Sequence, residues 1–479
     1  MSQGKYFDGF SPFAYGAPVW IIGILIIMAS DTIYALSTAP GQAGVAVIRI
    51  SGRNAGMIWN KMTSRQPEPR TASLVKLADP EDASEIDRCL ALWFPAPASF
   101  TGEDVVELHL HGGRAVVNGA ISGLAKLPEF RPAEAGEFTR RAFANDKLDL
   151  TEVEGLSDLI AAETEAQRKQ AIRQMDGELS RLIGSWREKL VRTLAYLEAE
   201  IDFPDEELEE GISEQVKNNI LRLQSEINQH LDDGHRFERL RDGFSIAIIG
   251  PPNAGKSSLL NALARREVAI VSDIAGTTRD VIEVHLDLAG YPVTLADTAG
   301  LRELEEASDN NIELEGMRRA RLRAEAADFR LAVFDLAASQ QLDPETLRLL
   351  ERGDGLVVLN KTDKPDDKNP DLVAELSDFE VRKISAKTGT GIDELIKRLT
   401  DEVVTKLGSA GASVGITRER HRKSLIDTSD ALSRSLLAPL PELSAEDLRL
   451  ATRHLGRITG KVDVEDLLDV IFRDFCIGK

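Results

Sequence analysis

Residues 250–258 read GPPNAGKSS, so a lysine and a serine directly follow the second of two glycines that stand five positions apart. A glycine-rich loop of this spacing lets several backbone N–H groups face one phosphate, and the helix that follows adds the N–H groups of its first turn. The Lys256 ammonium then suits the terminal phosphates of a nucleoside triphosphate, and the Ser257 hydroxyl suits Mg²⁺. The pattern predicts a nucleotide site with contacts from Asn253, Ala254, Gly255, Lys256, Ser257 and Ser258.

Three shorter motifs follow in chain order, and one of them selects the base. DTAG (residues 297–300) places Asp297 near Mg²⁺ and the Gly300 N–H near the γ-phosphate. NKTD (residues 360–363) ends in Asp363, whose carboxylate can accept two hydrogen bonds from guanine. Adenine lacks that pair of donors, so the sequence predicts GTP rather than ATP. With SAK (residues 385–387), these motifs predict contacts from Asp297, Thr298, Ala299, Gly300, Asn360, Lys361, Asp363, Ser385, Ala386 and Lys387.

Hydrolysis of the nucleotide needs a group that orients the attacking water. The residue after DTAG is Leu301, which cannot do so. The side-chain oxygen of Asn253 could hold a monovalent cation near the phosphates, where other enzymes use an arginine. The alternative is that Asn253 is an ordinary loop residue that satisfies its local backbone. The residues alone leave both interpretations open.

The four motifs need a scaffold of strands and helices in alternation, and residues 244–399 supply one. The apolar runs FSIAIIG, VTLADTAG, FRLAVFDL, GLVVLN and VRKIS predict strands. Continuous apolar strands of this kind are typical of a parallel sheet that is covered on both faces.

Long apolar stripes on both sides of this region predict helices. One stripe runs from Met175 to Ile201 at steps of three and four, and a second runs from Ile212 to Leu231. Helical periodicity resumes after residue 404, but the remaining residues are too few for a core of their own. We therefore expect the stripes before and after the nucleotide domain to form one helical domain.

The predicted fold is a multidomain α/β and α protein. Residues 1–28 are expected to be a non-native extension, because strand-like alternation begins only after Met28. Residues 29–147 predict an N-terminal α+β domain, residues 148–241 and 404–479 the two parts of a central helical domain, and residues 242–403 an inserted Ras-like P-loop GTPase domain with a mostly parallel sheet.

Composition excludes other classes of protein. The 479 residues include 58 Lys and Arg against 79 Asp and Glu, a net charge of −21, so the chain repels nucleic acid at long range. The densest basic segment, TRERHRKS with Arg418, Arg420, Arg422 and Lys423, is predicted to be a solvated helix face. The apolar run from Val19 to Met28 is shorter than the ~20 residues of a spanning helix, so no membrane segment is predicted.

The chain contains two cysteines, Cys89 and Cys476, which argues against a disulfide framework and for a reducing compartment such as the cytoplasm. Cys476 stands in the terminal sequence FCIGK. A prenylation signal would need aliphatic residues after the cysteine and an uncharged last residue, whereas Gly478 and Lys479 stand here. A disordered tail without a role is the other alternative.

The P-loop with Asn253, the stretch AIVSDIAGTTRD (residues 269–280), DTAGLRE and the terminal FCIGK closely resemble the MnmE (TrmE) family of tRNA modification GTPases. The resemblance runs from about Asp31 to Lys479. In that family the terminal cysteine lies at the folate site of the N-terminal domain. The resemblance therefore implies a catalytic role for Cys476.

The same resemblance implies ligands for each cofactor. K⁺ is expected on Asn253, Ser272, Ile274 and Thr277, and Mg²⁺ on Ser257 and Thr278. Asp273, Ala275 and Gly276 complete the expected GTP contacts, and Glu313 is the expected general base, with Glu315 as a rival. Arg49, Glu107, Lys147 and Lys479 are expected to bind 5-formyl- or 5,10-methylene-tetrahydrofolate; without the resemblance they could form an ordinary salt-bridged surface.

The implied function is a K⁺-stimulated, Mg²⁺-dependent GTPase that works with the flavoprotein MnmG. Together they would add an aminomethyl or carboxymethylaminomethyl group to carbon 5 of the wobble uridine in certain tRNAs. The family also implies a homodimer and a heterotetramer with MnmG. Two rival functions are a ribosome-assembly GTPase and a folate-dependent methyltransferase with a regulatory nucleotide domain.

Overall fold

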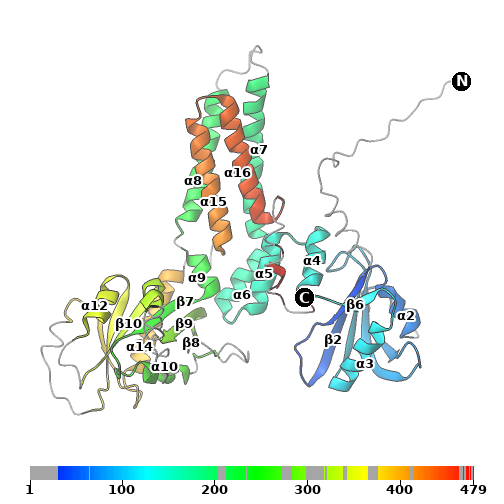
Figure 1. Ribbon diagram of the computed structural model, residues 1–479, viewed down its shortest axis with the longest axis horizontal. Coiled ribbons are helices and arrows are strands. Elements are labelled where there is room, and N and C mark those ends of the chain that lie inside the picture. Colours follow the sequence, from blue (N-terminus) through cyan, green and yellow to red (C-terminus); the bar gives the residue numbers. More distant parts are fainter. Residues whose placement is uncertain are drawn as a thin grey trace. The chain divides into compact units, whose positions relative to one another are not determined.

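The computed structural model describes residues 31–63, 65–202, 212–233, 235–266, 268–270, 283–297, 318, 321–337, 342–364, 376–408, 414–462, 468, 471–473, 475 and 478. They form two compact units (Figure 1). The first holds the described residues up to Asp149 and those of the segment Val464–Lys479, and the second holds those of Leu150–Asp463. The predicted extension, residues 1–28, lies outside the described residues.

The first unit is built on one six-stranded sheet. Its strands lie in the order β3 (Ser73–Ala78), β4 (Glu85–Phe94), β5 (Val105–Gly112), β2 (Ala43–Ser51), β1 (Thr32–Leu36) and β6 (Phe130–Pro132). Neighbours are antiparallel except β1 and β6. Side chains alternate between the faces, and one face packs its apolar residues under η1 (Ala55–Met57), α2 (Ile58–Lys61) and α3 (Arg114–Ala125). The predicted N-terminal α+β domain is confirmed.

The described residues of the C-terminal segment pack into this first unit. Phe472 is fully buried, and its ring centroid lies 6.4 Å from that of Phe143 in α4 (Glu137–Ala144). The Arg140 guanidinium lies 5.2 Å from the centroid of the Phe472 ring. The described residues of this segment therefore pack with the N-terminal domain, whereas their helical periodicity predicted that they pack with the helical domain. Periodicity predicts that an element has an apolar face, but it does not identify the partner of that face.

The helical part of the second unit joins segments from before and after the nucleotide domain. Helices α7 (Glu178–Asp202) and α8 (Ile212–Leu231) precede that domain, and α15 (Glu419–Leu437) and α16 (Pro441–Thr459) follow it. All four share one apolar core (Figure 1). Helices α5 (Leu150–Ala161), α6 (Glu165–Met175) and α9 (Arg236–Asp242) complete this part. The predicted insertion of the nucleotide domain is confirmed.

The stripe from Met175 to Ile201 is not one helix. Helix α6 ends at Met175, Gly177 adopts a left-handed backbone with φ 76°, and α7 begins at Glu178. A glycine in this conformation commonly ends a helix, and Met175 nevertheless remains in phase with the apolar residues of α7. Among the helices that the structure describes, none is long and apolar enough to cross a membrane.

The nucleotide domain contains a second six-stranded sheet. Its order is β12 (Val381–Lys383), β11 (Gly355–Asn360), β10 (Phe329–Asp335), β7 (Phe244–Ile249), β9 (Tyr291–Asp297) and β8 (Glu283–Leu288). All neighbours are parallel except β8 and β9. Each face of the sheet carries its own apolar core. Helices α10 (Lys256–Ala264) and α14 (Ile392–Leu407) pack on one of these cores, and α12 (Pro344–Glu351) packs on the other. The predicted, mostly parallel sheet is confirmed.

Candidate functional site

The P-loop connects β7 to α10. Lys256, the first residue of α10, is 6% exposed, and its Nζ donates to the carbonyl oxygens of Gly250 (2.8 Å) and Pro251 (2.9 Å). These bonds hold the ammonium over its own loop, from which it can turn to phosphate oxygens. Gly255 has φ 95°, and a β-carbon there would lie 2.3 Å from Asn360 Nδ2. The close approach of the next loop therefore requires glycine.

The NKTD loop, which is predicted to contact the base, also contacts the P-loop. Asn360 is 1% exposed; its Nδ2 donates to the Ala254 carbonyl at 3.1 Å, and its Oδ1 accepts from the Ala386 N–H at 3.0 Å. The Lys361 ammonium donates to the Asn253 carbonyl at 2.6 Å. The predicted P-loop, NKTD and SAK residues therefore meet at the carboxyl ends of the parallel strands, where sheets of this kind bind ligands.

The Asp363 carboxylate, which is predicted to select the base, accepts a hydrogen bond that orients it. The Ser385 hydroxyl donates to Asp363 Oδ1 at 2.6 Å, and this bond lowers the pKa of Asp363. Ser385 is fully buried and also accepts from the Thr388 N–H at 3.1 Å. The positive charge of Lys387 acts on Asp363 in the same direction. An ionised, oriented carboxylate suits the two adjacent donors of guanine.

Several predicted nucleotide and cofactor residues lie outside the described part of the chain. Ser257 and Ser258 belong to the first turn of α10, and Asp297 ends β9. The residues outside are Ser272, Asp273, Ile274, Ala275, Gly276, Thr277, Thr278, Thr298, Ala299, Gly300, Glu313, Cys476 and Lys479. Their roles remain predictions.

Two of the predicted folate residues are in direct contact in the first unit. Arg49 on β2 donates to Glu107 Oε1 on β5 from Nε at 3.0 Å and from Nη2 at 2.9 Å. The two side chains are 22% and 18% exposed, so the pair is largely buried. The Arg49 guanidinium also lies 5.5 Å from the ring centroid of Phe100 and 5.9 Å from that of Phe138. A guanidinium close to two aromatic rings differs from an ordinary surface ion pair.

Lys147 and the tail reach the same neighbourhood. Lys147 Cε lies 3.2 Å from the position of a β-carbon on Gly102, in the loop that also carries Phe100. Gly478 contacts the end of β1, and Ala35 on that strand is paired in register with Arg49. Gly478 therefore contacts the strand next to that of Arg49, and Lys147 lies beside the loop that carries Phe100.

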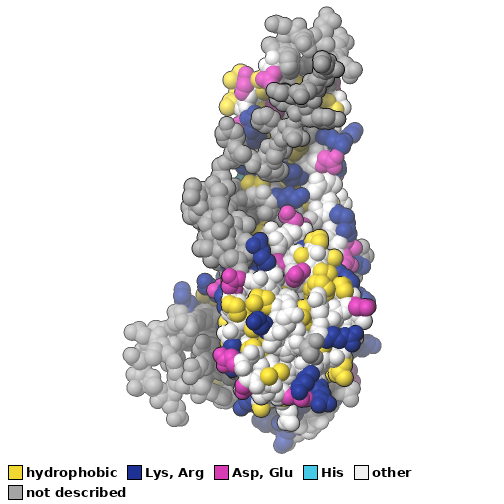
Figure 2. All heavy atoms as spheres, turned by 90° about the vertical axis from the view of Figure 1, so that its right-hand side faces the viewer, with side chains coloured by type: hydrophobic (Ala, Val, Ile, Leu, Met, Phe, Trp, Pro, Cys, Tyr) yellow, Lys and Arg dark blue, Asp and Glu magenta, His cyan; other side chains and the backbone are white. Residues whose placement is uncertain are grey.

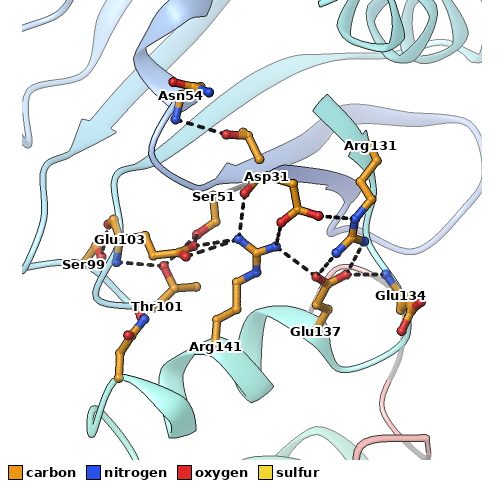
Figure 3. Close-up of polar contacts among 12 residues, drawn as sticks. Asp31, Ser51, Asn54, Ser99, Thr101, Glu103, Arg131, Glu134, Glu137 and Arg141 are labelled. Atoms are coloured by element: carbon orange, nitrogen blue, oxygen red, sulfur yellow. Dashed lines mark hydrogen bonds and ion pairs between the residues drawn. The ribbon is translucent and has the colours of Figure 1, made fainter. Parts of the chain in front are cut away.

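A largely buried ionic network joins elements of the first unit that also carry the aromatic neighbours of Arg49 (Figure 3). Arg141 of α4, with its side chain 4% exposed, donates to Asp31, Glu103 and Glu137 at 2.8 to 3.2 Å. Arg131 donates to Asp31 at 2.5 Å and to both oxygens of Glu137. Burial alone would raise the pKa of Glu137, but the two guanidinium groups keep it below its usual value. The network fixes α4, which carries Phe138, and the loop that carries Phe100; these are the two rings near Arg49.

The TRERHRKS segment is not the solvated helix face that its composition predicted. Arg420 donates to both oxygens of Glu154 in α5, at 2.6 and 2.7 Å, and His421 bonds the same carboxylate at 2.9 Å. His421 and Glu154 are each 1% exposed. The acidic partners stand more than 180 positions away in the sequence, so local composition could not reveal them. The remaining pairs join Arg418 to Asp158 and Arg422 to Glu238.

The sequence interpretation missed Asp335, the last residue of β10. Its Oδ2 accepts a hydrogen bond from Lys361 Nζ at 2.7 Å, next to the bond from that ammonium to Asn253. The available signal was a carboxylate at the end of an apolar strand, FRLAVFD, at the level of the other motifs. The aromatic partners of Arg49 were missed as well, because Phe100 and Phe138 belong to no motif.

A mostly parallel sheet, a glycine-rich loop before a helix and a carboxylate predicted to select guanine are together typical of a P-loop GTPase. In this chain the GTPase domain is inserted into a helical domain and accompanied by an N-terminal α+β domain.

Comparisons with known proteins identify the family. Residues 32–147 match the family model "GTP-binding protein TrmE N-terminus", and residues 150–476 match "MnmE helical domain". The chain is 57% identical over 454 residues to the tRNA modification GTPase MnmE of Parvibaculum lavamentivorans, covering 94% of this chain and 100% of that protein. It is 48% identical over 466 residues to the human mitochondrial 5-taurinomethyluridine-[tRNA] synthase subunit GTPB3, covering 94% and 93%.

Among solved structures, Era of Aquifex aeolicus matches with 25% identity and a TM-score of 0.27, covering 41% of this chain and 69% of that chain. The full-length relatives and the two family models establish that the chain belongs to the MnmE family of tRNA modification GTPases. It is a GTP hydrolase of tRNA modification.

Proposed function

We propose that this protein is a K⁺-stimulated, Mg²⁺-dependent GTPase that acts with the flavoprotein MnmG on the wobble uridine of certain tRNAs. The pair adds an aminomethyl or carboxymethylaminomethyl group to carbon 5, with a folate-derived one-carbon unit as the source of the methylene. One observation carries the proposal: the tail residue Gly478 lies against β1, beside the strand that holds Arg49. The Arg49 and Glu107 pair on the neighbouring strands supports a second ligand site in the first unit.

Asn253 supports the cation part of the proposal. Its backbone is left-handed, with φ 61°, and its carbonyl oxygen is held by Lys361, so the loop presents the side chain from a fixed position. A cation bound there would offset the negative charge that develops on the phosphates in the transition state. We assign K⁺ to Asn253, Ser272, Ile274 and Thr277, Mg²⁺ to Ser257 and Thr278, and the general base to Glu313.

The test of the cation part compares GTP hydrolysis in KCl and NaCl at equal ionic strength. We expect the rate in KCl to be higher by at least about tenfold, and the difference to disappear in Asn253→Ala. Equal rates for the wild-type protein in the two salts would reject this part.

The Arg49 and Glu107 pair supports the folate part. The Arg49 guanidinium can donate hydrogen bonds to the carbonyl group of a pterin, and the neighbouring Glu107 carboxylate can accept hydrogen bonds from pterin N–H groups. Lys147 and Lys479 are assigned to the glutamyl tail, and Cys476 to the chemistry at the one-carbon unit.

Binding of 5-formyl-tetrahydrofolate tests this assignment. Arg49→Met should weaken binding by at least about tenfold, since both the charge and the N–H donors are lost. Arg88→Met is the matched control, because Arg88 pairs with Glu85 at 2.7 Å but its side chain is 71% exposed. Equal affinities of the two variants would reject the assignment.

The surface supports a division of labour with the partner. The net charge is −21, and on the face shown in Figure 2 the Lys and Arg side chains are dispersed among acidic and hydrophobic ones. We propose that MnmG supplies much of the tRNA-binding surface, in a cytoplasmic heterotetramer with a homodimer of this chain. A Cys476→Ser variant should lose tRNA modification and keep GTP hydrolysis. Intact modification in this variant would reject the role proposed for Cys476.

A further inference from the structure

Asp335 stands between the two loops that hold the nucleotide. It ends β10, which lies between β7, the strand before the P-loop, and β11, the strand that ends in Asn360. Asp335 and Asn360 are paired in register. The Asp335 carboxylate is therefore at the level at which both loops leave the sheet.

Both oxygens of this carboxylate are engaged. Oδ2 accepts from Lys361 Nζ at 2.7 Å, and Oδ1 accepts from the Ala337 N–H at 3.0 Å. Lys364 lies farther away, at 3.8 Å from Oδ2, and the Asp335 side chain is 10% exposed. Burial alone would raise the pKa of Asp335, but Lys361 and the Ala337 N–H keep it below the usual value, so the group is ionised at neutral pH.

Lys361 extends this anchorage to the P-loop. Its Nζ lies 2.6 Å from the Asn253 carbonyl and 2.7 Å from Asp335. Lys361 (φ 68°) and Asn253 (φ 61°) both have left-handed backbones, which are uncommon for residues with a β-carbon, although less so for Asn than for Lys. The Lys361 ammonium thus links the NKTD loop to the P-loop, and its bond to Asp335 fixes its position.

We infer that Asp335 is a positioning residue of the nucleotide site. Through Lys361 it sets the backbone of Asn253, and so couples the guanine-binding loop to the P-loop residue proposed to bind K⁺. The consequence for the cation rests on the proposed function; the consequence for guanine nucleotide affinity does not. A merely structural role would lower stability alone and leave nucleotide affinity and cation preference unchanged.

Asp335→Asn tests this inference in the full-length protein. The Asn oxygen can still accept from the Ala337 N–H, whereas its amide group cannot accept from Lys361. Asp354→Asn is the matched control, since Asp354 forms a 2.6 Å pair with Lys406 in the same domain but is 59% exposed. Two quantities are measured: the Kd of a fluorescent GDP analogue, and the ratio of GTP hydrolysis rates in KCl and NaCl.

We expect Asp335→Asn to weaken GDP binding about tenfold and to lower the KCl to NaCl ratio, while Asp354→Asn matches the wild type. If Asp335→Asn does not fold, Asp335→Ser carries the same expectation, because its hydroxyl can still accept from the Ala337 N–H. A folded variant with unchanged affinity and ratio would overturn the inference.

Two mixed outcomes also decide. Weakened GDP binding with an unchanged ratio would overturn the coupling to Asn253. Equal wild-type rates in the two salts would instead reject the proposed K⁺ requirement, and Asp335 would then be judged by GDP affinity alone.

Discussion

The Ser37 hydroxyl donates a 3.0 Å hydrogen bond to the carbonyl oxygen of Gly478, 441 positions later in the chain. Gly478 has φ 102°, and a β-carbon there would lie 2.4 Å from the Leu36 carbonyl oxygen. The penultimate residue is thus seated against β1, whose Ala35 is paired with Arg49. A terminal segment held in this way is suited to carry residues of a binding site.

Replacing Gly478 by alanine should displace the tail, because the added methyl group has no room and the left-handed backbone becomes strained. We expect affinity for 5-formyl-tetrahydrofolate to fall about tenfold in a titration, with GTP hydrolysis unchanged. Gly44→Ala is the control, since no heavy atom lies within 4 Å of its β-carbon position. An unchanged affinity for Gly478→Ala would show that the contact between Gly478 and β1 does not contribute to folate binding.

Arg141→Met should destabilise the N-terminal domain by about 3 kcal/mol, because it leaves buried carboxylates without their shared guanidinium. Asp31, Glu103 and Glu137 all accept from Arg141 (Figure 3). Hydrogen exchange measured on peptides from β1 and α4 of the full-length protein should rise. Arg88→Met, which removes an exposed pair, should leave exchange unchanged. Equal exchange in both variants would contradict a stabilising role for the network.

The helical domain should lose stability on acidification because of His421. Burial, with the charges of Arg420 and Arg418, lowers the pKa of His421 to about 4, although Glu154 acts in the opposite direction. The unfolded chain, with a pKa near 6.5, therefore binds more protons than the folded state between these values. The contribution to the free energy of unfolding is complete above pH 6.5 and is lost as the pH falls toward 4.

His421→Gln isolates this contribution, because glutamine can still donate to Glu154 but does not titrate. Urea unfolding followed by circular dichroism should show a shallower pH dependence for the variant between pH 4 and 6.5. Asp158, whose pKa burial raises to about 6, titrates with the opposite slope in both proteins, so the difference between them reports His421. Parallel curves would contradict the buried, neutral imidazole.

Asp363→Asn should exchange guanine for xanthine. The Asn amide donates where the carboxylate accepts, so it faces the donors of guanine but suits the additional carbonyl group of xanthine. We expect GTP affinity to fall about 100-fold and XTP affinity to rise in competition binding. Asp354→Asn serves again as the control, and an unchanged preference for GTP would mean that Asp363 does not select the base.

The nucleotide site could be predicted from the sequence because its residues form short motifs at the ends of strands. Asn360 contacts both Ala254 and Ala386, since parallel strands bring their carboxyl ends together. Asp335 escaped notice because a single carboxylate at a strand end has no motif, and its partner Lys361 lies in the loop that follows another strand.

Contacts between segments that are distant in the sequence could not be predicted either, because no local motif marks their partners. Arg420 belongs to a basic run that is typical of a solvated face, yet its partner Glu154 stands 266 positions earlier. The break at Gly177 was hidden because Met175 keeps the phase of the stripe across it. Local pattern identifies an element and its apolar face, while burial of charge depends on which remote segment provides the counter-charge.

Mass spectrometry of tRNA nucleosides tests the proposed role in tRNA modification, with cells that lack this protein compared to the same cells with the gene restored. We predict that aminomethyl-type derivatives of the wobble uridine are missing in the first and return in the second, and that Cys476→Ser fails to restore them. Unchanged nucleosides in cells without the protein, with no second copy of the gene, would contradict the proposed role in tRNA.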